Sequence, residues 1–340
     1  MRRLLAVAVA LMSAWAVRAQ VSPWMVFDVP TDPRAAGLGG RLVAGLEADA
    51  HGATYSPALM DSANATRVAF DHVRYFGGLH ASAVGYTWGT RRGWTLTSGA
   101  RFAGFGELNE TDDTGQVIGS FSGGETVVQS GVSKRLNDRW RVAGRVVLGL
   151  RNVDRETAGM AGLELGMHGL FAEQRLAVGA ALTGWGRQIG IDGNQPDGRL
   201  PANLQVGAVK GFEHAPFRLH LRLSDLQTWD LAPEGTYDPL IDPLTGEEIP
   251  SGKWAFGDRL MRHVGVGTEL LLSDALAIQV GFDYRRRAEL NANGRTGTNG
   301  FSIGTSFAVK QFQLRLSRNT YHFAGSSTHL ALNIPLSAWI

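Results

Sequence analysis

The sequence predicts an all-β protein, a 14-stranded antiparallel transmembrane β-barrel with a small N-terminal hatch. Three observations predict it. The chain begins with an export leader, its segments after residue 66 alternate between apolar and polar residues, and the connections between them are alternately short and long. No segment after the leader is apolar for long enough to form a transmembrane helix, so a membrane-embedded chain must close into a barrel.

The leader has the three parts of a secretory signal peptide. Arg2 and Arg3 precede an apolar run that ends at Val17, and Val17 and Ala19 provide small residues for a cleavage site. The run is too short for a membrane anchor, which needs roughly 20 apolar residues. We therefore predict that residues 1–19 are a signal peptide and that the mature chain begins at Gln20.

Composition excludes several classes of protein. Without Arg2, Arg3 and Arg18 of the leader, the 33 basic residues fall to 30 against 31 acidic ones, a net charge of −1. A chain with this charge is not a polycation, so we expect no nucleic-acid partner. The sequence has no cysteine, which excludes disulfides, thiolate metal sites and a lipoprotein anchor.

Strict alternation predicts the strands, which we place in residues 67–340. Residues 276–285 are an example, with apolar residues at even positions and small or polar residues at odd ones. Fourteen such segments are centred near Ala69, Val84, Thr97, Ser130, Val146, Leu165, Val178, Val206, Leu221, Val266, Val280, Ile303, Leu314 and Leu332. A soluble β-sandwich, in which the apolar face packs inward, is the alternative fold.

The connections favour the barrel. Tight turns at residues 91–93, 137–138, 173–174, 213–214, 273–274 and 310–311 join every second pair of strands. Most of the others are longer, as at residues 106–124, 186–199, 230–260 and 286–296. Outer-membrane barrels sort their connections in this way, with short turns in the periplasm and longer loops outside.

In a barrel the polar face of each strand lines the lumen. We expect a luminal polar network there, and because both signs of charge are present we expect its members to pair and fill the interior. The residues of this network are Arg218, Arg222, Glu269, Asp283 and Arg285.

Residues 20–66 do not alternate and contain several turn signals, so they predict a hatch of turns and short helices inside the barrel. The hatch turn at Ser56, Pro57 and Ala58 resembles the Asn-Pro-Ala turn of FadL-like barrels, with serine in place of asparagine. A more specific resemblance lies in residues 214–325. Segments 214–218, 225–231, 242–246, 258–263, 283–290, 295–297 and 320–325 read HAPFR, DLQTWDL, DPLTG, DRLMRH, DYRRRAEL, RTG and TYHFAG.

In this order and spacing the segments resemble the PorQ family of the type IX secretion system. The resemblance implies a FadL-like outer-membrane barrel that is not an enzyme and needs no cofactor. It implies that the barrel anchors a PorZ-like surface protein in an attachment complex with PorU- and PorV-like subunits. Outer-membrane lipid and lipopolysaccharide would be its other partners.

The connection at residues 230–260 is the best candidate for docking a partner, because binding residues concentrate on loops held by a rigid scaffold. The residues we expect to bind are Trp229, Asp230, Tyr237, Asp242 and Trp254. A lid packed over the barrel mouth is the alternative for this loop. No catalytic, phosphate-binding or metal-binding motif is present in the sequence. Two functions therefore remain: a secretion-complex anchor, and a FadL-like transporter of hydrophobic small molecules.

Overall fold

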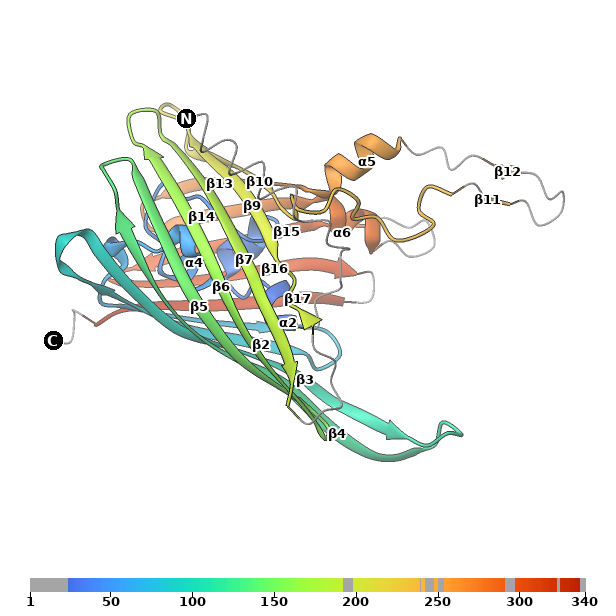
Figure 1. Cartoon of the computed structure of the whole chain (residues 1–340). Helices are drawn as coiled ribbons and strands as arrows, with labels where there is room; N and C mark the ends of the chain where they lie inside the picture. Colours follow the sequence, from blue (N-terminus) through green and yellow to red (C-terminus); the bar gives the residue numbers. More distant parts are fainter. Residues whose placement is uncertain are drawn as a thin grey trace, which may run out of the picture.

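Fourteen antiparallel strands close into one barrel in the computed structural model (Figure 1). The structure describes residues 24–191, 198–238, 240–241, 248–249, 254–290, 297–322 and 325–336. The barrel strands are β1 (Arg67–Arg74), β2 (His80–Gly89), β3 (Trp94–Thr111), β4 (Val117–Arg135), β5 (Trp140–Val153), β6 (Glu156–Phe171), β7 (Leu176–Gly190), β9 (Asn203–Gly211), β10 (Phe217–Leu223), β13 (Val264–Ser273), β14 (Leu276–Asp283), β15 (Phe301–Val309), β16 (Phe312–His322) and β17 (Gly325–Pro335).

The barrel closes between its first and last strands, where Arg67 of β1 pairs with Pro335 of β17. A short extra strand, β8 (Gly198–Arg199), pairs with the end of β7. Outside the barrel, β11 (Leu240–Ile241) pairs with β12 (Glu248–Ile249). Every predicted strand centre falls within one of the fourteen barrel strands, so the predicted fold class is confirmed. No helix among the described residues is long and apolar enough to cross a membrane.

The alternation of the sequence sorts side chains between the two faces of the wall. Leu221, Val266 and Val280 are exposed on the outside, whereas Glu269 and Gln279 are buried on the inside. A sheet that is apolar outside and polar inside is the reverse of a soluble barrel and is typical of one that faces lipid.

The barrel has two different ends. At the turn end, the strands are joined by the tight connections, including the single-turn helix η3 (Arg91–Gly93). At the loop end, β10 and β13 are joined by residues 224–263, which contain α5 (Ala255–Arg262), and β14 is followed by α6 (Tyr284–Glu289).

Two features of the loop end differ from the sequence prediction. Residues 106–124 are not a long loop, because β3 and β4 pair as far as Thr111 and Val117 and form an arm beyond the rest of the wall (Figure 1). Asp112 closes this hairpin by accepting hydrogen bonds from the backbone N–H groups of Thr114 and Gln116, each at 2.9 Å. Arg285 is not on a luminal strand, because Asp283 caps α6 by accepting a hydrogen bond from the Arg286 N–H.

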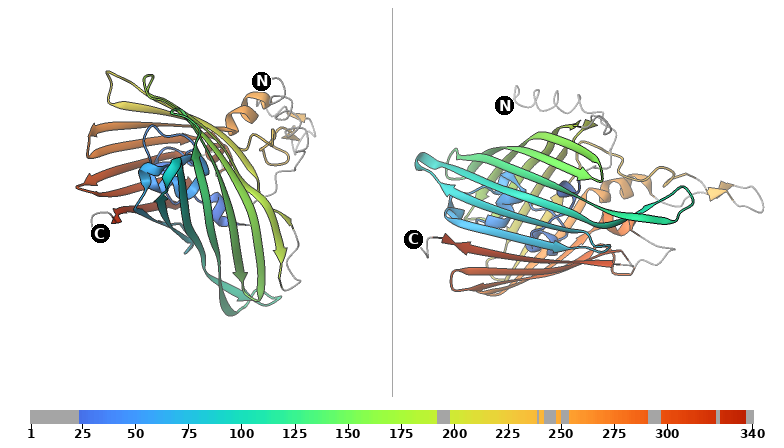
Figure 2. Two further views of the ribbon diagram at one scale, coloured as in Figure 1. Left: turned by 60° about the vertical axis from the view of Figure 1, so that its left-hand side comes forward. Right: turned by 90° about the horizontal axis from the view of Figure 1, so that it is seen from below.

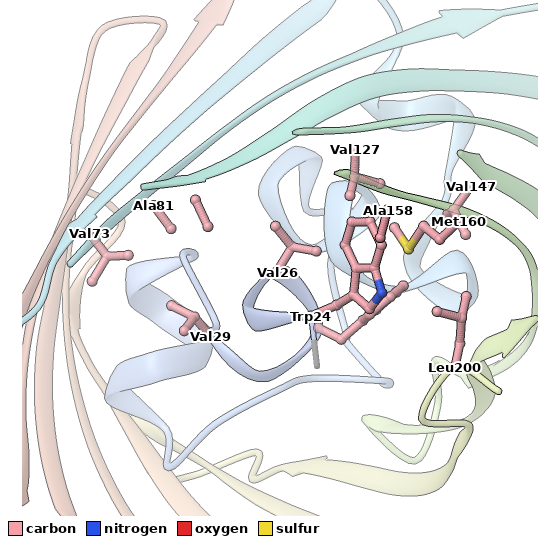
Figure 3. Packing of buried hydrophobic residues seen from close by; sticks show 12 residues of the cluster. Trp24, Val26, Val29, Val73, Ala81, Val127, Val147, Ala158, Met160 and Leu200 are labelled. Carbon is pink, nitrogen blue, oxygen red and sulfur yellow. The ribbon is translucent and has the colours of Figure 1, made fainter. Parts of the chain in front are cut away.

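The hatch places short helices inside the lumen, where the barrel surrounds them (Figure 2). They are α2 (Met25–Asp28), α3 (Pro33–Gly37), α4 (Ala50–Tyr55), η1 (Pro57–Leu59) and η2 (Ser62–Asn64). Asp32 and Asp49 cap α3 and α4 through their carboxylates. The largest apolar cluster joins Trp24 and Val26 of the hatch to the wall residues Val127 and Met160 and to Leu200, which lies between β8 and β9 (Figure 3). The predicted signal peptide lies outside the described residues.

Glycines on the inner wall let the hatch backbone lie directly against the sheet. A Cβ atom on Gly179 of β7 would lie 1.8 Å from the Val43 carbonyl oxygen. One on Gly281 of β14 would lie 2.1 Å from the Gly39 nitrogen. At such separations any larger residue would collide with hatch backbone, so the wall is fitted to the hatch in its observed position.

Candidate functional site

Buried ion pairs hold the hatch against the inner wall. Glu269 on β13 accepts two hydrogen bonds from Arg34 of α3, from Nε at 2.8 Å and from Nη2 at 2.9 Å. Arg218 on β10 also contacts Glu269, at 3.3 Å. Three strands further round the barrel, Arg315 on β16 contacts Asp49 at 3.0 Å and Asp32 at 3.2 Å, and Asp49 also contacts Arg34 at 3.1 Å. The hatch thus provides the counter-charges for Glu269 and Arg315 in one continuous network against the part of the wall between β13 and β16.

The structure brings most of the predicted luminal network together, but in two groups. Arg218 and Glu269 belong to the hatch contact, whereas Arg222 and Asp283 form a separate pair at 2.6 Å nearer the loop end. Arg285 lies on α6 and contacts Asp225 at 3.3 Å and Glu289 at 2.9 Å. Sequence reasoning missed Arg34 and Asp49, because the hatch has no periodicity that would mark a side chain as facing the wall.

The hatch turn lies against β6. A Cβ atom on Gly166 would lie 2.2 Å from the Ala58 nitrogen, so the turn that contains Pro57 and Ala58 touches the wall directly. Ser56 is buried, and its hydroxyl has no hydrogen-bond partner among the described residues.

Above the hatch, the loop end of the lumen contains a cavity of about 1220 Å³. Phe27, Asp28 and Arg41 of the hatch form one side of it, and Arg222 and Asp283 lie on the wall. Residues of the loop end also line it, among them Leu231, Arg262, Arg285 and Leu290. The expectation that paired polar residues fill the interior therefore fails at this end of the barrel.

The cavity reaches the outer face of the wall beside β7. It is lined by Leu200, which is buried with Trp24 inside the barrel, and also by Val146, Leu163 and Trp185, whose side chains are exposed outside. Here the pairing of β6 with β7 shifts register, and Gly184 has a positive φ of 66°. The pairing of β7 with β9 ends just before this β-bulge, at Thr183 and Asn203, and the Pro201 carbonyl oxygen lies against Gly184.

The solved structures that are similar to this chain include the following two. One is a Pseudomonas aeruginosa FadL homologue, with 13% sequence identity and a TM-score of 0.51, covering 90% of this chain and 98% of its own. The other is the monoaromatic hydrocarbon channel CymD, with 11% identity and a TM-score of 0.50, covering 88% and 95%. This is the FadL-type barrel fold. No protein-family model matches the sequence, and no curated protein matches it.

The FadL-type barrel of this chain carries an outer cap, which we define as residues 224–238, α5 and α6. Asp258 of α5 is its central acceptor and takes hydrogen bonds from Arg262 at 2.7 Å, Tyr237 at 2.7 Å and Tyr284 at 2.8 Å. Arg262 also contacts Glu289 of α6 at 3.3 Å. Polar contacts therefore hold the two helices together.

Some of the predicted partner-binding residues are bound within the outer cap, and others are exposed on the surface. Asp230 and Tyr237 are engaged within the cap, since Asp230 contacts Arg259 at 2.9 Å and Tyr237 binds Asp258. Trp229 and Trp254 are exposed. Asp242 lies outside the described residues. Two of the four described residues thus support the lid that was the alternative for this loop, and two remain on the surface.

We expect the cap to loosen in acid. Although partial burial opposes its ionisation, the hydrogen bonds from Arg262, Tyr237 and Tyr284 hold the pKa of Asp258 below its usual value. A carboxyl whose folded-state pKa is lowered stabilises the cap above its unfolded-state pKa of about 3.9, and this contribution is lost as the pH falls through the folded-state pKa. Hydrogen exchange of α5, corrected for intrinsic rates, should therefore accelerate below pH 4.

The Asp258→Asn variant is the control for this prediction. Its α5 should exchange faster than the wild type at neutral pH and should show no further acceleration in acid. Equal protection in both proteins at neutral pH would contradict the role of Asp258.

Among the described residues, no cluster of histidine and carboxylate side chains could hold a metal ion.

Proposed function

We propose that this chain is an outer-membrane channel for apolar small molecules that carry an acidic group. The observation that carries the proposal is the cavity of about 1220 Å³, which extends from the loop end of the lumen to the outer face of the wall beside the β7 bulge. A concave site with apolar walls and a few charged groups is the usual form of a small-molecule site.

The lining of the cavity supports this class of molecule. Phe27, Trp185 and Leu200 provide apolar surface. The described charged residues of the lining are seven arginines and four carboxylates, namely Arg41, Arg187, Arg199, Arg222, Arg262, Arg285, Arg286, Asp28, Asp225, Asp283 and Glu289. An excess of arginine favours an anionic group at one end of the molecule, since guanidinium groups bind carboxylates well.

The hatch and the bulge suggest the route. Ion pairs and close backbone contacts fix the hatch across the lumen, so a straight path along the barrel axis would require it to move. The cavity lining suggests a different exit, sideways through the wall beside Trp185 and Gly186 and into the bilayer. CymD, which has the same fold, is described as a channel for monoaromatic hydrocarbons, so this type of barrel can serve such cargo.

Narrowing the cavity at Gly162 should slow uptake several-fold. A Cβ atom there would lie 3.1 Å from Val147, 3.2 Å from Leu200 and 3.3 Å from the Trp185 carbonyl, so the Gly162→Leu side chain would occupy the inner side of the opening. The measurement is uptake of a radiolabelled long-chain fatty acid by cells that express each variant, with the methyl ester of the same acid run in parallel.

Gly144→Leu is the matched control, because a Cβ atom on Gly144 would meet only Leu165, at 3.8 Å. Gly144→Leu should transport like the wild type when both barrels are inserted at equal levels. Wild-type uptake by the Gly162→Leu barrel would contradict a route through this cavity, and equal uptake of acid and ester would contradict the role of the arginines.

A second candidate function is the anchoring of a surface protein, as the resemblance to the PorQ family implies. The observation that favours it is the β3–β4 arm. In the part of the chain that the structure describes, its outer part has no strand on either side, because β2 pairs with β3 only as far as Gly104 and β5 pairs with β4 only as far as Gly123. The arm bears Glu107, Glu110 and exposed Ile118. Free strand edges of this kind can pair with a strand from a partner protein. Because the arm carries glutamates, the expected partner strand is a basic edge strand of a PorZ-like protein.

Two deletions test the anchoring function. Removing residues 234–253, or replacing residues 108–121 with an Asn-Gly turn, should lower recovery of the surface protein from outer membranes while the barrel still inserts. Barrel insertion is followed by heat-modifiable migration in gels. Undiminished recovery of the surface protein with both deletions would exclude these two surfaces as its anchor.

A further inference from the structure

Helix α5 is packed with its polar side inward. Asp258 and Arg262, which are one turn apart, face Tyr237, Tyr284 and Glu289 of the outer cap. Arg262 is buried although it is charged. In a surface helix of a soluble protein the apolar side faces the core. The orientation of α5 is the opposite, so its apolar side faces away from the protein.

That apolar side forms an aromatic patch, which consists of Trp229, Trp254, Phe256 and Leu260. Trp254 is 75% exposed, Phe256 56% and Trp229 49%. The rings touch one another, with centroids 5.5 Å apart for Trp229 and Phe256 and 6.0 Å apart for Trp254 and Phe256. Trp229 also stacks on His263, with centroids 5.7 Å apart. The patch is therefore held in shape by its own contacts and by the end of the helix.

The aromatic patch continues the outer apolar surface of the barrel. Helix α5 ends at Arg262, and after His263 the chain enters β13 at Val264. Val266, the next exposed residue of β13, is paired with Phe282, whose ring lies 4.9 Å from that of Phe301 on β15. Figure 1 shows α5 at the same end of the barrel, beside α6. Among the described residues, the chain passes from α5 through His263 directly into β13, so the patch adjoins the surface that would face lipid.

We propose that α5 and Trp229 lie in the interfacial layer of the outer leaflet and anchor the outer cap to the membrane surface. The exposed side of α5 bears Phe256 and Leu260, with Trp254 at its N-cap, and these are the residue types that interfacial helices bury in the headgroup layer. Tryptophan is also enriched where membrane proteins meet the headgroup layer. This anchor goes beyond uptake and requires only that the barrel is inserted in a bilayer.

The absence of cysteine from the chain allows a clean test, because each single-cysteine variant can carry one nitroxide label. Phe256→Cys and Leu260→Cys label the aromatic patch. Leu221→Cys labels the outer face of β10, and Asp113→Cys labels the exposed tip of the β3–β4 arm. Each labelled barrel is reconstituted into phosphatidylcholine vesicles. Collision of the label with oxygen, which partitions into lipid, is compared with collision with a water-soluble nickel chelate.

The two patch labels should resemble the Leu221 label, with an oxygen-to-nickel ratio several-fold above that of the Asp113 label. The interfacial anchor would be overturned if the patch labels had the same oxygen-to-nickel ratio as the Asp113 label. It would also be overturned if neither reagent reached them, as in a contact between protein surfaces. A Leu221 label that matches the Asp113 label would show that the barrel is not inserted. That result would overturn the membrane placement of the proposed channel together with this inference.

Discussion

Replacing Gly179 with leucine should displace the hatch and lower the free energy of unfolding by about 3 kcal/mol, the upper end of the usual cost of overpacking. The new Cβ atom would lie 1.8 Å from the Val43 carbonyl oxygen, and the colliding atom is backbone, so no side-chain rotation can relieve the contact. Urea unfolding of the barrel in lipid vesicles measures the loss, and limited trypsin digestion at Arg34 and Arg41 reports displacement of the hatch.

Gly198→Leu is the control, because a Cβ atom at Gly198 has no heavy atom within 4 Å. It should leave both measurements unchanged. If Gly179→Leu also kept wild-type stability and protease resistance, the hatch would not be seated against β7 as the structure places it.

Replacing Glu269 with leucine should destabilise the barrel by about 3–5 kcal/mol, the range for breaking a buried ion pair by removing one partner. Glu269 is buried and accepts two hydrogen bonds from Arg34, one from Arg218 and one from Gln279. Without it, Arg34 keeps only the contact with Asp49 at 3.1 Å, so a buried positive charge loses its main partner.

The double variant Arg34→Met with Glu269→Leu separates the ion pair from a general packing defect. Removing both charges should restore part of the lost stability, because no arginine of the hatch is then left opposite an apolar wall residue. Urea unfolding of the wild type, both single variants and the double variant gives the coupling between the two residues. Losses that simply add would contradict a direct interaction between Arg34 and Glu269.

The strands could be predicted from the sequence because each one obeys a local rule. In the segment around Val280, apolar residues alternate with small or polar ones, and the structure places these on opposite faces of β14. The alternation of apolar and polar residues does not reveal where a residue caps a helix. Asp283 continues the alternation as a luminal carboxylate would, but it also caps α6, so the prediction carried the strand on to Arg285.

The site was harder to predict because distant segments build it. Arg34 and Glu269 are 235 residues apart, and no spacing in the sequence pairs them. The cavity depends on the β7 bulge, for which the sequence does hold a signal. Gly184 and Gly186 flank Trp185 within a strand, and Pro201 follows close by, a composition that marks irregular pairing. The apolar side of α5 was visible as Trp254, Phe256 and Leu260, but its outward orientation depends on Tyr237 and Tyr284.

The most direct test of the proposed channel is to purify the tagged barrel from its own outer membranes in mild detergent and to identify what accompanies it by mass spectrometry. An uptake channel should retain an acidic apolar molecule in a 1:1 complex that the Gly162→Leu variant loses. The channel would be contradicted if the barrel held no small molecule and instead co-purified with a large surface β-protein and PorU- and PorV-like subunits. That result would identify the chain as an anchor.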